Sequence, residues 1–71
     1  MKLRRLEDLR DERDWTQKAV ASELHISQRA YSYYENGTRS VPLDVLIKLA
    51  DLYDVSLDYL VGRSNARKVH R

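Results

Sequence analysis

Four polar residues stand at helical spacing on one side of the segment from Ser27 to Asn36, namely Gln28, Arg29, Ser32 and Tyr33. The same periodicity assigns the other side, with Ala30, Tyr31 and Tyr34, to a core. A Gln side chain can bond bidentately to adenine and an Arg side chain to guanine, and a Tyr ring can meet a thymine methyl group or a phosphate. The four residues are therefore candidates for reading base edges. Any exposed helix carries such side chains, so the case depends on the motif around them.

The start of the preceding segment suggests a second kind of chemistry. Thr16 and Gln17 open a stretch with helical periodicity, and the first amides of a helix attract anions. We therefore expect these two residues to contact phosphates of a nucleic-acid backbone. Such contacts would position the protein without specifying a sequence.

Catalytic chemistry has little support in this chain. There is no Cys and no Gly-rich phosphate loop, and the plausible Ser and Thr nucleophiles stand where helix caps are expected. His25 and His70 have no evident acid or base partner, and no cluster of ligands indicates a metal site. We therefore expect no enzymatic activity, no cofactor and no metal.

The elements that would position these side chains are two short helices with a tight turn between them, at residues 16–37. Thr16 and Ser27 are placed to cap the two helices, and Gly37 suits a left-handed C-terminal turn. Ala21 is small enough to let the helices approach closely. Because the connection is so short, the helices must cross steeply, as in a helix-turn-helix.

Three further helices complete an all-α prediction. The spacing of Leu3, Leu6 and Leu9 predicts a helix at about residues 2–13. Pro42 suits the first position of a fourth helix, whose broad apolar face should form much of the core. That face comprises Leu43, Leu46, Ile47, Leu49, Ala50 and Tyr53. A short fifth helix at residues 57–61 should add Leu57 and Leu60.

Three of the predicted helix starts follow the same pattern. An apolar residue precedes the capping residue, and a second apolar residue lies four positions after the cap, which is the arrangement of a hydrophobic staple. The pairs are Trp15 with Val20, Ile26 with Tyr31, and Val55 with Leu60. This repetition makes the three boundaries the best-supported part of the structural prediction.

The chain resembles the phage repressor and Cro-type family of helix-turn-helix proteins over about residues 2–62. The matching residues are Thr16-Gln17, Ala21, Ile26-Ser27-Gln28, Tyr31, Tyr34, Glu35-Asn36-Gly37 and the run from Ser56 to Gly62. The resemblance implies a compact five-helix bundle, like the lambda repressor domain, with the helix-turn-helix in helices two and three. It also implies a transcriptional regulator, in particular a repressor, that binds double-stranded operator DNA as a homodimer. The helix from Ser27 to Asn36 would enter the major groove.

The resemblance also implies roles for residues outside that helix. Residues matching Gln17 and the loop after helix three bind phosphates in the family, which here points to Asn36, Thr38, Arg39 and Ser40. Residues matching Arg10 and Glu35 form a partly buried ion pair that orients helix three. Self-contact would lie around Val41, Val55, Leu57 and Asp58. His25 stands where the family usually has Gly, so it must adopt a positive φ, which His tolerates at some strain.

Size and charge set the remaining expectations. A chain of 71 residues accommodates one domain, which we place at residues 1–62. Those residues carry nine basic and eleven acidic side chains, a net charge of −2, so DNA binding must depend on where charges lie. With no Cys, no long apolar run and no signal-peptide pattern, we expect a cytoplasmic protein without a membrane segment.

Residues 63–71 form a basic tail with a net charge of +4. One interpretation is a loose, solvated C-terminal end. The other is an electrostatic arm that adds nonspecific DNA affinity and steepens its dependence on salt.

A different class of function stays open. The fold can serve as a protein-interaction module, such as an antitoxin or the partner of an anti-repressor, because fold alone does not imply function. Asp44, Asp51, Asp54 and Asp58 oppose only Lys48 in that region, and such a surface would suit a basic partner.

Overall fold

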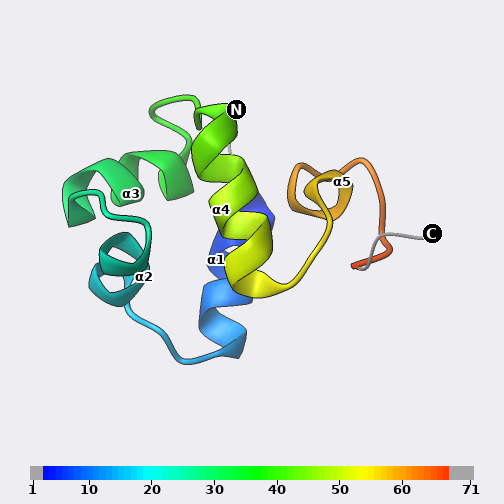
Figure 1. The fold of residues 1–71 in the computed structure, drawn as a ribbon, viewed down its shortest axis with the longest axis horizontal. Coiled ribbons are helices and arrows are strands. Elements are labelled where there is room, and N and C mark those ends of the chain that lie inside the picture. Colours follow the sequence, from blue (N-terminus) through cyan, green and yellow to red (C-terminus); the bar gives the residue numbers. More distant parts are fainter. Residues whose placement is uncertain (1–2, 68–71) are drawn as a thin grey trace.

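The computed structural model describes residues 3–67 and contains five helices and no strand within that range. They are α1 (Arg4–Glu12), α2 (Gln17–Glu23), α3 (Gln28–Asn36), α4 (Leu43–Tyr53) and α5 (Leu57–Leu60). In Figure 1, α4 occupies the middle of the molecule, with α2 and α3 to its left and α5 to its right. The predicted all-α, five-helix fold is confirmed.

Side-chain caps begin three of the helices at the predicted residues. The hydroxyl oxygens of Thr16, Ser27 and Ser56 accept hydrogen bonds of 3.0 Å from the amides of Ala19, Ala30 and Tyr59. Each cap satisfies one of the amides that a helix start leaves without an internal partner. The residues before the caps, Trp15, Ile26 and Val55, pack half-buried against the core. Val20, Tyr31 and Leu60, four positions after the caps, lie inside it.

One hydrophobic core joins all five helices. Its buried side chains are Leu3, Leu6, Leu9, Val20, Ala21, Leu24, Tyr31, Val45, Leu49, Ala50, Tyr53 and Leu60. Leu3, which precedes α1, and Leu6 and Leu9 within it belong to this core as predicted. Tertiary burial therefore stabilises α1, whose outer surface is densely charged.

The fourth helix differs from its prediction in two respects. Pro42 has an extended conformation (φ −61°, ψ 151°), so it precedes the helix as its N-cap and Leu43 begins it. Leu43 and Ile47 are 65% and 44% exposed, whereas Val45, absent from the predicted face, is buried. Residues 45, 49 and 53 follow one another at successive turns, which places 43 and 47 on another side of the helix.

The other helix boundaries shift by one or two residues. The first helix begins at Arg4 and ends at Glu12, and the predicted start at Lys2 lies outside the described residues. The last helix ends at Leu60, with Val61 as its C-cap. Its Leu57 is 38% exposed, so Leu60 alone of the two expected leucines enters the core.

The segment after α5 is not loose over residues 63–67. Arg5 donates from Nη1 to the carbonyl oxygens of Tyr59 and Ser64, both at 2.6 Å, and from Nη2 to Asn65. The Arg67 guanidinium pairs with both carboxylate oxygens of Glu12, and the Arg67 carbonyl accepts from the Ser56 amide. This short strap therefore ties α5 back to α1, and the rest of the predicted tail, residues 68–71, lies outside the described range.

Candidate nucleic-acid interface

The turn between α2 and α3 has the backbone conformation that the sequence predicted. His25 has a φ of 58°, the left-handed value that the family position requires. The His25 amide bonds to the Ser22 carbonyl and the Ile26 amide to the Ala21 carbonyl, at 3.1 and 3.0 Å. Ala21 itself is 2% exposed, and its small side chain belongs to the hydrophobic core. The local geometry is that of a helix-turn-helix.

The outer face of α3 collects the side chains expected to read bases. Gln28 and Arg29 are exposed, and Ser32 and Tyr33 are half-buried. Together with Gln17 at the start of α2, these four residues line a shallow depression of about 450 Å³. On the inner face, Tyr31 and Glu35 are buried. The structure thus brings together one predicted phosphate contact and all four predicted base contacts.

The loop after α3 holds the remaining predicted phosphate contacts. Gly37 ends the helix in the left-handed conformation (φ 82°), and the amides of Thr38 and Arg39 both donate to the Tyr33 carbonyl. The Asn36 side-chain oxygen accepts from the amide and the hydroxyl of Thr38. Thr38, Arg39 and Ser40 are exposed, so the loop presents polar groups beside the outer face of α3.

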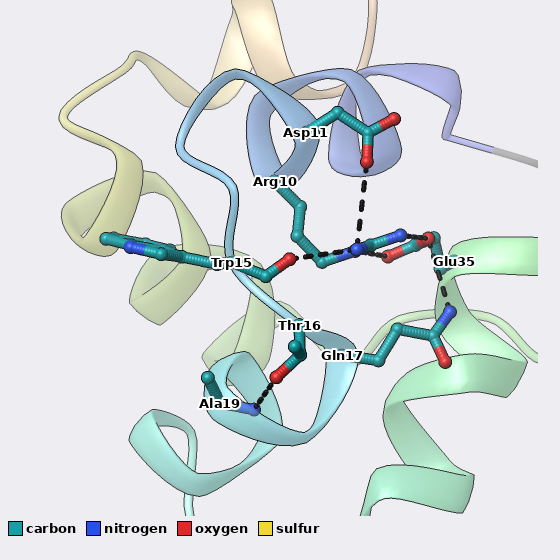
Figure 2. Close-up of polar contacts among 7 residues, drawn as sticks. All are labelled: Arg10, Asp11, Trp15, Thr16, Gln17, Ala19 and Glu35. Atoms are coloured by element: carbon teal, nitrogen blue, oxygen red, sulfur yellow. Dashed lines mark hydrogen bonds and ion pairs between the residues drawn. The ribbon is translucent and has the colours of Figure 1, made fainter.

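An ion pair links α1 to α3 behind this face (Figure 2). Arg10 donates from Nε and Nη2 to the two carboxylate oxygens of Glu35, at 3.0 and 2.9 Å, and from Nη1 to the Trp15 carbonyl at 2.9 Å. Gln17 donates to the same carboxylate at 3.3 Å. Glu35 is 3% exposed. One buried carboxylate of α3 therefore contacts residues of two other helices, α1 and α2, and sequence reasoning missed the contact with Gln17.

The charges of this pair are set by burial and hydrogen bonding. Burial alone raises the pKa of the Glu35 carboxyl, but hydrogen bonding, chiefly from Arg10, outweighs it and leaves the pKa below its usual value. The hydrogen bond to Glu35 raises the pKa of the Arg10 guanidinium. Burial, with the Glu35 carboxylate nearby, raises the pKa of the Tyr31 phenol. Glu35 and Arg10 are thus both charged at neutral pH.

The residues expected to make a dimer contact lie on another surface. Val55, Leu57 and Asp58 line a depression of about 410 Å³ between α4 and α5. Val41, half-buried in the loop before α4, does not line it. Ile47 borders the depression, and its exposure was not foreseen because the sequence assigned it to the core. Leu57 and Ile47 give this surface an apolar character.

Residues 3–67 contain neither a candidate metal site nor a candidate membrane span. No group of three or more His, Asp and Glu side chains in that range is placed to hold a metal ion. None of its helices is both long enough and apolar enough to cross a bilayer.

Comparison with known proteins gives consistent results. Residues 6–60 match the Helix-turn-helix family. The chain is 40% identical over 65 residues to the HTH-type transcriptional regulator ImmR of Bacillus subtilis, covering 92% of this chain and 51% of the relative. It is 38% identical over 68 residues to the regulator AnsR of the same organism, covering 96% and 59%. It is also 40% identical over 60 residues to the cryptic phage CTXphi transcriptional repressor RstR of Vibrio cholerae, covering 84% and 54%.

The chain spans little more than half the length of these three relatives. The residues matched by the family, 6–60, span the turn at His25, the capped start of α3 and the buried pair behind it. Family assignment and three-dimensional structure therefore agree on the same segment. The protein belongs to the helix-turn-helix family.

Proposed function

We propose that this protein is a transcriptional regulator that binds double-stranded DNA sequence-specifically through α3. The observation that carries the proposal is the outer face of α3. Its four hydrogen-bonding side chains, Gln28, Arg29, Ser32 and Tyr33, line one shallow depression with Gln17. In a helix-turn-helix the second helix lies in the major groove, with its N-terminal residues against base edges.

The two residues nearest the start of α3 would carry most of the sequence discrimination. Gln28 can pair bidentately with adenine, and Arg29 can pair with guanine through O6 and N7. Both side chains are exposed at the end of the helix that would point into the groove. Ser32, one turn later, can donate to or accept from either type of base.

Phosphate contacts would flank the groove on both sides of α3. Thr16 and Gln17 lie at the start of α2, while Asn36, Thr38, Arg39 and Ser40 lie just after α3. The Thr16 hydroxyl oxygen accepts from the Ala19 amide, which leaves its proton for a phosphate oxygen. These contacts would fix the register of α3 and add affinity that depends on salt.

We also propose that the protein acts as a homodimeric repressor. A single α3 reaches few base pairs, and two copies on half-sites about one helical turn apart would read enough for useful specificity. The apolar surface of α4 and α5, near Val55, Leu57 and Asp58, supports self-contact there. A repressor role is supported by the name of RstR.

The decisive experiment is selection of bound sequences from a random DNA pool. The wild-type chain should enrich a two-fold symmetric site, and the Gln28→Ala/Arg29→Ala variant should lose that enrichment. Arg63→Ala is the matched control, because it removes a positive charge from an exposed residue after α5. Losing Arg29 alone should cost roughly 1–3 kcal/mol and relax preference at one base pair. Enrichment that survives the double substitution would contradict reading by α3.

A second candidate function is that of a protein-interaction module, such as an antitoxin or an anti-repressor partner. The exposed side chains of Leu43, Ile47 and Leu57 favour it, because apolar exposure on a small domain often marks a contact surface. Asp51 and Asp58 border the same depression and would suit a basic partner. Absence of any enriched DNA sequence would favour this second candidate.

A further inference from the structure

We infer that Tyr33 and Arg39 act as one phosphate-binding unit, in which the Tyr33 ring holds the Arg39 guanidinium in position. Tyr33 is then a positioning residue for a sequence-independent contact, and base discrimination falls to Gln28, Arg29 and Ser32. This inference rests on the proposed DNA-binding function, and it changes the role of Tyr33 within it.

The backbone and the side chain of Tyr33 both hold the loop that carries Arg39. The amides of Thr38 and Arg39 donate to the Tyr33 carbonyl at 3.0 and 3.3 Å. The Arg39 guanidinium carbon lies over the Tyr33 ring, 4.6 Å from its centroid. Gly37, in its left-handed conformation, turns the chain back so that both contacts are made. The position of Arg39 is therefore determined by a residue six positions earlier in the chain.

Hydrogen bonding distinguishes Arg39 from the other stacked arginines. Within residues 3–67, four arginines stack on aromatic rings: Arg5, Arg13, Arg39 and Arg67. Arg5 donates to the Tyr59 carbonyl, Arg13 to the Tyr53 carbonyl and Arg67 to Glu12. The Arg39 guanidinium donates to no acceptor in that part of the chain. Arg39 is exposed and its guanidinium is held by its face against Tyr33, so its N–H donors are available to an acceptor on a ligand.

The chemistry of that acceptor is that of a phosphate. A guanidinium stacked on a ring keeps its five N–H donors available, and their planar fork matches two phosphate oxygens. Holding the side chain in one geometry before binding reduces the entropy lost on binding. Tyr33 also lines the depression on α3, so a phosphate on Arg39 would lie at the edge of the groove that α3 enters.

The test measures binding to a labelled duplex of mixed sequence, about two helical turns long, across a range of salt concentrations. The salt slope is the slope of the logarithm of affinity against the logarithm of salt concentration. Arg39→Gln should reduce its magnitude by about one, because one phosphate contact is lost. Tyr33→Leu should produce a similar loss, with a roughly two- to fivefold weaker affinity, the strength of an exposed cation–aromatic contact. The double variant should be no weaker than Arg39→Gln alone, and Tyr33→Phe, which keeps the ring, should bind like the wild type.

Two controls keep the outcomes separate. Lys48→Gln removes a positive charge from an exposed residue of α4, outside every predicted DNA contact, and should leave the slope unchanged. The Arg39 δ-methylene protons of the free protein should show an upfield ring-current shift in NMR spectra of the wild type and Tyr33→Phe, and not of Tyr33→Leu. Thermal unfolding establishes that each variant is folded.

Three results would overturn the inference. The first is a wild-type spectrum without the ring-current shift. The second is that Tyr33→Leu binds DNA with the wild-type salt slope, or that the double variant loses as much affinity as Tyr33→Leu and Arg39→Gln lose together. In that case Tyr33 and Arg39 act independently while the proposed function stands. The third is a wild-type chain with intact stacking and no salt-dependent binding, which would remove the proposed function and the inference with it.

Discussion

At the scale of single residues, Glu35 connects α3 to the rest of the domain. A buried carboxylate is costly unless it is paired and hydrogen-bonded, and here Arg10 and Gln17 provide that pairing. Such pairs add little net stability, because loss of hydration offsets their attraction. Their effect is geometric: Arg10 also bonds to the Trp15 carbonyl, so the pair sets the positions of α1, α3 and the start of α2.

Removing one partner of this pair should be far more damaging than removing both. Glu35→Ala leaves the Arg10 cation partly buried and should reduce the free energy of unfolding by about 3–5 kcal/mol. The double variant Arg10→Met/Glu35→Leu should lose much less, since no buried charge is left unpaired. Urea unfolding of Arg10→Met, Glu35→Leu and the double variant measures the coupling between the two residues. An unchanged stability and DNA affinity in Glu35→Ala would contradict the proposed orienting role.

The acid dependence of stability offers an independent check on the same residue. The pKa of Glu35 is lower in the folded state than in the unfolded chain. Its contribution is therefore complete above the unfolded pKa of about 4.3 and is lost as the pH falls through the folded value. The Glu35→Gln variant should show a weaker loss of stability in that acidic range than the wild type.

At the scale of elements, the strap at residues 63–67 joins the end of the domain to its beginning. The Arg5 guanidinium lies 4.0 Å from the centre of the Tyr59 ring and donates to the backbone of the strap. Hydrogen bonding from Arg67 lowers the pKa of the Glu12 carboxyl. Figure 1 shows this segment at the opposite end of the longest axis from α2 and α3. The donors of Arg67 are thus used within the protein, which argues against a DNA-binding role for that residue.

Ending the chain after Gly62 should therefore destabilise the domain. We expect the free energy of unfolding to fall by roughly 1–3 kcal/mol, the scale of hydrogen bonds to a charged group. Arg5→Gln in the full chain should cause a comparable loss, as chemical denaturation would show. In the shortened chain its effect should be smaller, because only the contacts of Arg5 with Tyr59 remain there. If the shortened chain unfolds like the full one, the strap has no structural role.

A lower salt slope of DNA binding in the shortened chain would support the electrostatic-arm interpretation.

At the scale of the whole molecule, charge and apolar area are distributed unevenly. Residues 1–62 have a net charge of −2, yet α3 and its following loop present Arg29 and Arg39 and, apart from buried Glu35, no carboxylate. Local placement therefore matters more for DNA attraction than net charge. The α4–α5 surface combines apolar Ile47 and Leu57 with acidic Asp51 and Asp58, which disfavours DNA and suits a protein contact.

If this surface mediates the proposed homodimer, a charge placed on it should separate the copies. In sedimentation experiments on the complex with the DNA site enriched from the random pool, Leu57→Lys should shift the protein from dimer toward monomer. Leu57→Lys should also weaken binding to a duplex with two half-sites far more than binding to a duplex with a single half-site. Leu57→Met keeps the apolar bulk and is the matched control. Equal effects of Leu57→Lys on one and two half-sites would show that dimerisation does not use this surface.

The features that the sequence determined by itself are local ones. Hydroxyl side chains at positions 16, 27 and 56 cap helices because the acceptor and the amide are three residues apart. The tight turn at His25 needs a residue with a positive backbone φ, and this requirement does not depend on the tertiary packing around the turn. The outer face of α3 was readable because buried and exposed residues alternate there with helical periodicity.

The tertiary structure alone decided which surfaces meet. Apolar residues surround much of α4, so periodicity could not tell that Val45 would be buried and that Leu43 and Ile47 would stay exposed. That choice depends on where α1 and α5 pack. The strap depends on Arg5, which bonds to a carbonyl 59 residues away, and the buried carboxylate of Glu35 joins side chains from α1 and α2. Contacts between residues so far apart leave no periodic signal, because they follow from the packing of the folded chain.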